Sequence, residues 1–227
     1  MSLLNNERLA RKINRVFDNN AFWWVWLPDP FVGYSVRGSY HMLTSRDVPL
    51  RDPASSLIWH NQVPLKVSLF AWRLLRDRLS IKANLVQRRV LDSEASLCVS
   101  DCGMSETAQH LFLSCDAFSS LWPLVHYWLG ILGVDINVLL DHFLQFVNLT
   151  GGGKAIRDFF QLIWLLCVWV LWNERNNRFF NNVVTSIPRL LDKVKYMSLA
   201  WLKANKVVFR FGSDMWCSSP LQCLGIT

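Results

Sequence analysis

Three of the six cysteines gather around a histidine, and this cluster is the part of the chain best suited to chemistry. Its members are Cys98, Cys102, His110 and Cys115, in the spacing C-x3-C-x7-H-x4-C. Thiolate and imidazole are ligands that Zn²⁺ prefers, and four of them fill a tetrahedral structural site. The spacing therefore predicts a closed zinc site with no position left for a catalytic water. The competing interpretation is a set of ordinary buried cysteines beside a core histidine.

The geometry of the cluster sets conditions on the chain around it. His110 and Cys115 lie five residues apart, too far round for successive turns of one α-helical face. We therefore expect the helix to unwind near Ser114, or Cys115 to lie at its end. Gly103, directly after the second cysteine, allows the chain to turn back under the metal. The first residues contain no apolar secretory signal, so we expect reduced thiols and a nuclear or cytoplasmic protein.

The segment directly before the cluster is strongly basic. Between residues 64 and 91 it carries seven basic residues against one acid, Asp77, for a net charge of +6. The basic residues are Lys66, Arg73, Arg76, Arg78, Lys82, Arg88 and Arg89. Such a surface binds phosphates by releasing counterions, so we expect contact with RNA or DNA. The competing interpretation is a solvated helix face without a partner.

The elements that must position these residues are expected to be mainly α-helical. Residues 64–79 form the clearest amphipathic helix, with one predicted core stripe. That stripe consists of Leu65, Leu69, Trp72, Leu75 and Leu79. Further helices are expected over residues 3–17, 53–60, 81–90, 120–132, 156–180 and 187–206. A strand over 21–27 can pair with 34–36, so the predicted fold class is mainly α (α+β), with a small N-terminal β-hairpin and a structural zinc knuckle.

Five regions follow along the chain. We expect a lead-in with the aromatic hairpin over 1–60, a zinc-binding domain over 61–130, a linker over 131–155, a tryptophan-rich helical region over 156–211 and an irregular tail over 212–227. The sequence TGGGK at 150–154 lacks the first glycine and the final Ser/Thr of a phosphate-binding loop. It is therefore interpreted as a linker.

Composition bounds the class of protein. The chain has 227 residues, of which 52% are hydrophobic and 18% charged, and it contains 12 tryptophans, which excludes a disordered tail. Residues 159–172 form an apolar run of 14, whereas a membrane span needs roughly 18–20 apolar residues. A buried helix is therefore favoured, and membrane attachment is the less favoured alternative.

Taken together, these residues resemble a known family. The stretch VPLKVSLFAWRLL at 63–75, followed by Asn84-Leu85, Arg88-Arg89 and the Cys/His cluster, is similar to the zinc-binding domain after the reverse transcriptase of plant LINE-type (non-LTR) retrotransposons. Residues 33–37 (GYSVR) resemble the lead-in to that domain, and residues 163–176 resemble the tryptophan-rich helix that often follows it. The resemblance covers roughly residues 20–180.

The resemblance implies a non-catalytic accessory module of a retrotransposon polyprotein. Its structural Zn²⁺ would be held by Cys98, Cys102, His110 and Cys115, and the module would help to hold template RNA or target DNA. The parent element would be an RNA-directed DNA polymerase, but its catalytic core is not in this sequence, so we expect a stand-alone or remnant domain without enzymatic activity. The alternatives are a non-functional remnant and an interaction module that packs against a reverse-transcriptase core or a second copy of itself.

Overall fold

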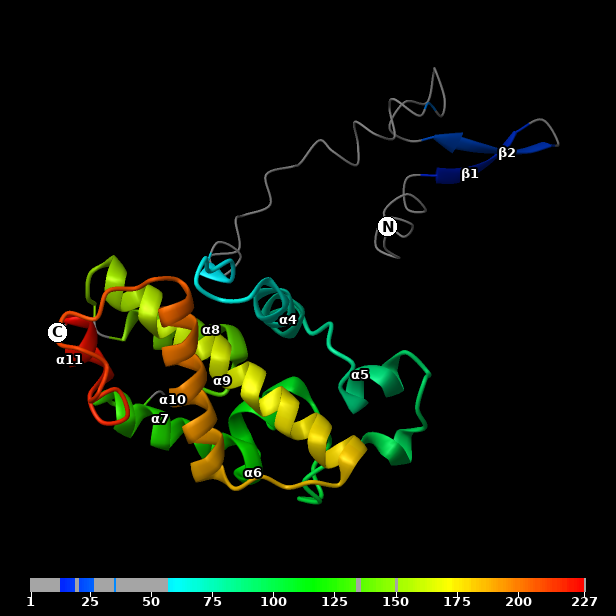
Figure 1. The fold of residues 1–227 in the computed structure, drawn as a ribbon. Helices are drawn as coiled ribbons and strands as arrows, with labels where there is room; N and C mark the ends of the chain where they lie inside the picture. The colour runs from blue at the N-terminus through cyan, green and yellow to red at the C-terminus, as the bar shows by residue number, and fades with distance from the viewer. Residues whose placement is uncertain are drawn as a thin grey trace. The chain divides into compact units, whose positions relative to one another are not determined.

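The computed structural model describes residues 13–18, 21–26, 35, 57–133, 136–149 and 151–226. The chain divides into two units, Met1–Asp52 and Pro53–Thr227, and each is described by itself. In the first unit, β1 (Ile13–Asp18) pairs antiparallel with β2 (Ala21–Trp26) (Figure 1). The register runs from Ile13 opposite Trp26 to Asp18 opposite Ala21.

This pairing differs from the one that the sequence predicts. The helix expected over residues 3–17 is wrong for 13–17, which lie in β1. Asn19 and Asn20 alone separate the two strands in sequence, and asparagine favours two-residue connections, a local signal that outweighs weak helical spacing. The hairpin expected between 21–27 and 34–36 is not shown, because β2 pairs with β1 and both Tyr34 and Val36 lie outside the described residues.

The second unit consists mostly of helices, as expected. They are α4 (Leu65–Leu75), α5 (Lys82–Gln87), α6 (Asp116–Ser119), α7 (Leu121–Leu129), α8 (Leu139–Asn148), α9 (Lys154–Asn181), α10 (Ile187–Ala204) and α11 (Pro220–Leu224). A 3₁₀ turn, η1 (Ser93–Ser96), precedes the metal-ligand cluster, and a π-helical turn, η2 (His110–Ser114), contains its histidine. The helices expected over 64–79, 81–90, 120–132, 156–180 and 187–206 are confirmed with shifted bounds as α4, α5, α7, α9 and α10.

Helix α9 is the centre of this unit. Its 28 residues pack against α4, α8 and α10 (Figure 1). Side chains such as Phe160, Trp164 and Leu165 are fully buried. Among the described helices, α9 is long and apolar enough to cross a membrane, and 67% of its most apolar window is buried inside the unit. Burial on this scale is what the interpretation as a core helix requires.

The buried face of α4 matches the predicted stripe only in part: Leu79 is buried, and Trp72 and Leu75 pack half-buried against the core. Leu65 and Leu69 belong to the predicted stripe, yet they are 72% and 40% exposed. The buried face consists instead of Val67, Phe70, Ala71 and Leu74. Both sets have helical spacing, so periodicity alone could not choose between them. Packing decides, because the Phe70 ring contacts the indoles of Trp169 and Trp172 on α9.

The expected linker over 131–155 contains α8, so that part of the prediction is wrong. The inward face of α8 consists of Leu139, His142, Phe143, Phe146 and Val147, at the i, i+3, i+4, i+7, i+8 spacing of an amphipathic helix. The chain between α8 and α9 includes the glycines at 151–153.

The expected irregular tail also contributes to the core. Trp216 is buried, and its indole Nε1 donates a hydrogen bond to the Lys195 carbonyl of α10 at 2.9 Å. Its own carbonyl accepts a bond from Trp128 Nε1 of α7 at 3.1 Å. Through its side chain and its backbone carbonyl, Trp216 thus ties the tail to two helices.

Candidate metal centre and nucleic-acid interface

The structure brings the four predicted metal ligands together. The ligand atoms of Cys98, Cys102, His110 and Cys115 all lie within 4.8 Å of one another. Cys98 Sγ is 3.9 Å from Cys115 Sγ, and Cys102 Sγ is 3.2 Å from His110 Nε2. A tetrahedral site with Zn–S bonds of about 2.3 Å separates its sulfurs by about 3.8 Å. The donor set and its spacing therefore fit a zinc ion.

A tight turn forms the first edge of the cluster. The Cys98 amide donates to the Met104 carbonyl at 2.8 Å, and the Asp101 amide donates to the Cys98 carbonyl at 3.2 Å. Gly103 has a φ of +77°, in the left-handed region that glycine enters without steric cost. The chain therefore reverses directly after Cys102, as Gly103 predicts.

A π-helical turn forms the second edge. The Cys115 amide donates to the His110 carbonyl at 2.7 Å, which closes a hydrogen bond over five residues instead of four. This wider turn places residues that are five apart on the same side of the chain. His110 and Cys115 can therefore bind the same metal ion. The sequence predicts a departure from α-helix near Ser114, and the structure places it there, with Cys115 directly after the turn.

Two serines that sequence reasoning missed line the cluster. Ser100 Oγ lies 3.3 Å from Cys98 Sγ and 3.1 Å from Cys115 Sγ. Ser114 Oγ lies 3.4 Å from His110 Nδ1, while His110 Nε2 faces the cluster. Hydrogen bonds of this kind orient metal-ligating imidazoles and tune thiolates. The sequence signal for these contacts is the spacing: Ser100 follows Cys98 by two residues, and Ser114 follows His110 by four.

The two cysteines of the first edge differ in their ionisation. Burial raises the pKa of the Cys98 thiol to about 12, whereas a hydrogen bond from Ser100 is the largest of the effects that lower the pKa of Cys102 to about 6. Thiolates, not thiols, bind zinc. Metal binding must therefore displace the proton of Cys98, whereas the lowered pKa of Cys102 makes its thiolate easier to form.

A buried ion pair joins the cluster to the central helix. Arg175 Nη2 on α9 lies 2.6 Å from Glu106 Oε1, and Arg175 Nε donates to the same oxygen at 3.2 Å. That oxygen also accepts the backbone amide of Lys82 at 3.1 Å. Glu106 therefore connects the metal loop (residues 97–115) with both α5 and α9.

Three of the seven predicted basic residues meet around one pocket. Lys66, Arg73 and Arg78 line a hollow of about 260 Å³, together with Trp169 and Trp172 of α9. Beside the pocket, the guanidinium groups of Arg76 and Arg78 lie 5.0 and 5.5 Å from the centre of the Trp72 ring. Cations and indoles therefore alternate over this side of α4.

The other basic residues lie elsewhere. Lys82 Nζ donates to the Leu97 carbonyl at 2.7 Å and lies 5.3 Å from the centre of the Phe179 ring. Arg88 and Arg89 are exposed at the end of α5, outside the residues that line the pocket. Lys82 thus supports the metal loop, and Lys66, Arg73 and Arg78 form the more concentrated cationic site.

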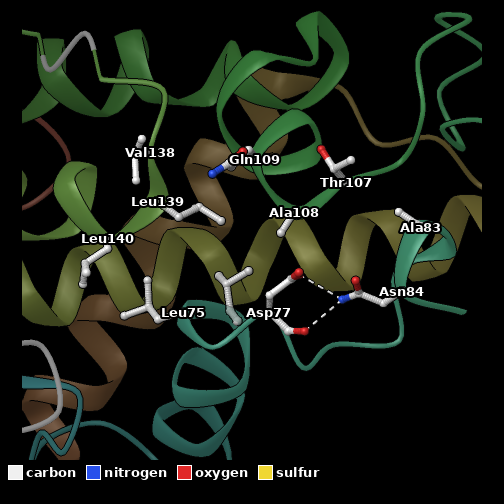
Figure 2. Close-up of a pocket in the computed structure, with 11 residues that line it drawn as sticks. Leu75, Asp77, Ala83, Asn84, Thr107, Ala108, Gln109, Val138, Leu139 and Leu140 are labelled. Carbon is white, nitrogen blue, oxygen red and sulfur yellow. Dashed lines mark hydrogen bonds between the residues drawn. The ribbon is translucent and has the colours of Figure 1, made fainter. Parts of the chain in front are cut away.

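A second hollow, of about 340 Å³, lies beside the turn between α4 and α5. Figure 2 shows Asn84 directed toward Asp77, with Leu139 and Leu140 of α8 on the facing side. Asn84 Nδ2 donates to Asp77 Oδ1 at 2.9 Å and to the Asp77 carbonyl at 3.1 Å. Asp77 has a φ of +50°, so these bonds stabilise a left-handed residue that ends α4. The polar groups here hold the basic helix in place.

Comparisons with known proteins agree with this site. Residues 34–122 match the family model described as zinc-binding in reverse transcriptase, and the match includes α4, α5 and all four cluster residues. Comparison with curated proteins and with solved structures gives no match. The family match and the four-ligand geometry together support a structural Zn²⁺. Within residues 34–122, the chain is therefore similar to the zinc-binding domain found in reverse transcriptases.

Proposed function

We propose that this chain is a zinc-stabilised, non-catalytic accessory module that contacts RNA or DNA through the basic side of α4. The observation that carries the proposal is the cluster of four ligand atoms within 4.8 Å, in a chain that also gathers three cationic side chains around one pocket of α4. Four protein ligands complete a tetrahedral zinc site, which suits a structural role. Zinc binding contributes about 10–16 kcal/mol to the folding of small zinc-finger peptides, enough to fix the loop over residues 97–115.

The proposed origin is a plant LINE-type retrotransposon polyprotein. The match over residues 34–122 supports the domain type. The tryptophan-rich stretch over residues 163–176 supports the finer assignment, because it resembles the helix that often follows this domain in those elements. In the structure this stretch lies in α9 and carries Arg175, the partner of Glu106.

Electrostatics supports the nucleic-acid contact. Lys66 and Arg73 are exposed and lie two helical turns apart on α4, so both ammonium and guanidinium groups can reach one phosphate backbone. Each phosphate that such a group neutralises releases a counterion, and affinity then falls as salt rises. The expected binding is largely independent of sequence.

The test compares two double variants that remove the same charge. Lys66→Ala/Arg73→Ala changes the proposed surface, and Arg189→Ala/Lys193→Ala changes exposed residues of α10. Binding of the zinc-loaded chain to a labelled single-stranded oligonucleotide is followed by anisotropy between roughly 50 and 200 mM salt. We expect the first variant to weaken binding and to reduce the log–log salt slope by about 1.4, and the second to bind like the wild type. Equal losses in both variants, or no salt-sensitive binding, would contradict the proposal.

A second candidate is self-association through α4. Leu65 and Leu69 form an exposed apolar strip on this helix, one turn apart. A second copy of the chain could bury both strips. Sedimentation velocity at rising concentration tests this candidate: a dimer that Leu69→Glu dissolves, together with indifference to nucleic acid, would favour it over the first.

A further inference from the structure

We infer that the pocket between α4 and α9 holds one unpaired base of a single-stranded nucleic acid, with Trp169 as the stacking surface. The inference rests on the proposed nucleic-acid contact and names its substrate class, which is single strand and not duplex. Phosphate contacts alone do not require such a pocket. A pocket that combines indoles with cations can bind both parts of a nucleotide, because the indole stacks on the base and the cations contact the phosphate.

The lining of the pocket has the required chemistry. It consists of Lys66, Leu69, Phe70, Arg73, Arg78, Leu79, Ser80, Trp169 and Trp172. Three of these residues are cationic, none is acidic, and four offer aromatic or aliphatic surface beside the indole of Trp169. The volume of about 260 Å³ is below the roughly 300–1,000 Å³ of pockets for drug-sized ligands. The hollow is therefore suited to one flat group, with charge at its rim for the flanking phosphates.

Trp169 is the ring best placed to receive a base. Phe70 packs edge-on against it, with the ring centres 5.4 Å apart and the planes at 73°, and α9 anchors its backbone in the core. Lys66 Nζ lies over the indole, 5.7 Å from its centre. Lys66 is exposed on a flexible stem, so an entering base can take its place while the ammonium moves to a phosphate.

Trp172 lines the same pocket in a different setting. Arg175 lies 5.2 Å from the centre of its ring, and Phe70 lies 5.7 Å away at an interplanar angle of 34°. Arg175 is itself held by Glu106 and cannot leave the ring as Lys66 can. Trp172 is therefore a wall of the pocket, and Trp169 is the stacking surface.

This arrangement discriminates by strandedness. In a duplex each base is already stacked on its neighbours, and its face reaches a protein ring only after the base leaves the stack. In a single strand the bases are free to stack on aromatic side chains, and every base has such a face. We therefore expect preference for single strands without strong preference for sequence.

The experiment measures anisotropy with the full, zinc-loaded chain and three labelled probes of equal length. The probes are a single strand, the same strand with abasic sites in place of its central bases, and the corresponding duplex. Stacking of a base on an aromatic side chain corresponds to about fivefold or more in affinity. We expect the intact strand to bind at least about fivefold more tightly than the abasic strand, and more tightly than the duplex.

Variants assign the effect to one ring. Trp169→Leu should lose about fivefold or more for the intact strand and nothing for the abasic strand, and Trp169→Phe should retain most of the affinity. Trp59→Leu is the matched control, because Trp59 is an exposed tryptophan (49%) outside the pocket. If Trp169→Leu fails to fold or to hold zinc, Trp169→Met replaces it, because methionine also removes the ring but fills irregular core gaps. An unchanged ratio of intact to abasic affinity in the folded variant would overturn the assignment to Trp169.

The outcomes separate this inference from the proposed function. Equal affinity for intact and abasic strands, or for strand and duplex, with the salt dependence retained, would overturn the base pocket and leave the phosphate contact standing. Absence of salt-sensitive binding to all three probes would overturn the proposed function and the pocket together.

Discussion

Arg175 on the central helix and Glu106 in the metal loop, 69 positions apart in sequence, share a buried hydrogen-bonded ion pair 2.6 Å long. Both residues are almost fully buried, at 3% and 0% exposure. Such a pair loses its hydration, so its two charges depend on each other. The pair fixes the loop over residues 97–115, which contains the four metal ligands, against α9, which also forms one wall of the basic pocket.

Breaking this pair on one side should destabilise the protein strongly. Glu106→Ala leaves the guanidinium of Arg175 buried without its partner, and we expect a loss of about 3–5 kcal/mol in the free energy of unfolding. The double variant Glu106→Leu/Arg175→Met removes both charges and should recover most of that loss. Urea denaturation with zinc present measures both values. A double variant as unstable as the single one would contradict a charge-balance role.

The hydroxyl of Ser114 should tune zinc affinity. It lies 3.4 Å from His110 Nδ1, where it can accept the ring proton and leave Nε2 free for the metal. Loss of such outer contacts typically weakens metal binding by about 10–100-fold, and this bond is long, so we expect about tenfold for Ser114→Ala. Competition with a chromophoric chelator measures the affinity. Ser218→Ala, whose hydroxyl donates only to the Met215 carbonyl in the described structure, should bind zinc like the wild type.

The sequence was most informative where function depends on short spacing. The ligand set and the turn at Gly103 depend on residues within a short stretch, and both are recovered from spacing and residue type. The full buried face of α4 is not recovered from the sequence, because Leu65/Leu69 and Val67/Phe70 both have helical spacing. The contact of Phe70 with Trp169 and Trp172 on α9 determines which pair is buried.

The long-range ion pair between Glu106 and Arg175 is not predictable from the sequence for a related reason. Nothing local connects Glu106 with Arg175, since η2, α6, α7 and α8 all lie between them in the chain. Helix α8 was missed although Phe143 and Phe146 lie at helical spacing, because the glycines at 151–153 marked a longer region as linker. The pocket of Trp169 depends on which side of α9 meets α4, which only packing determines.

Acid should destabilise the core through His142. Trp164 Nε1 donates to His142 Nδ1 at 3.0 Å, so the ring must present a lone pair there, and burial lowers its pKa to about 4. The unfolded chain, with a histidine pKa near 6.5, binds the proton first as pH falls. The contribution of neutral His142 to the free energy of unfolding should therefore be fully present above about pH 6.5. It should fall progressively toward pH 4, by up to about 3 kcal/mol.

The contribution of His142 is isolated by difference. His142→Gln keeps an acceptor for the indole but does not titrate. The variant should show a smaller loss of stability between pH 6.5 and pH 4 than the wild type, as measured by urea denaturation at each pH. Parallel stability curves for the two proteins would show that His142 does not bind the proton on unfolding.

The zinc content of the purified full chain tests the central claim most directly. Elemental analysis should give one zinc per chain for the wild type, and far less for Cys102→Ser, which changes the one exposed cysteine of the cluster. Cys217→Ser changes an exposed cysteine outside the cluster and should keep the full complement. A wild type with much less than one zinc per chain, or a Cys102→Ser variant that keeps its zinc, would contradict the account.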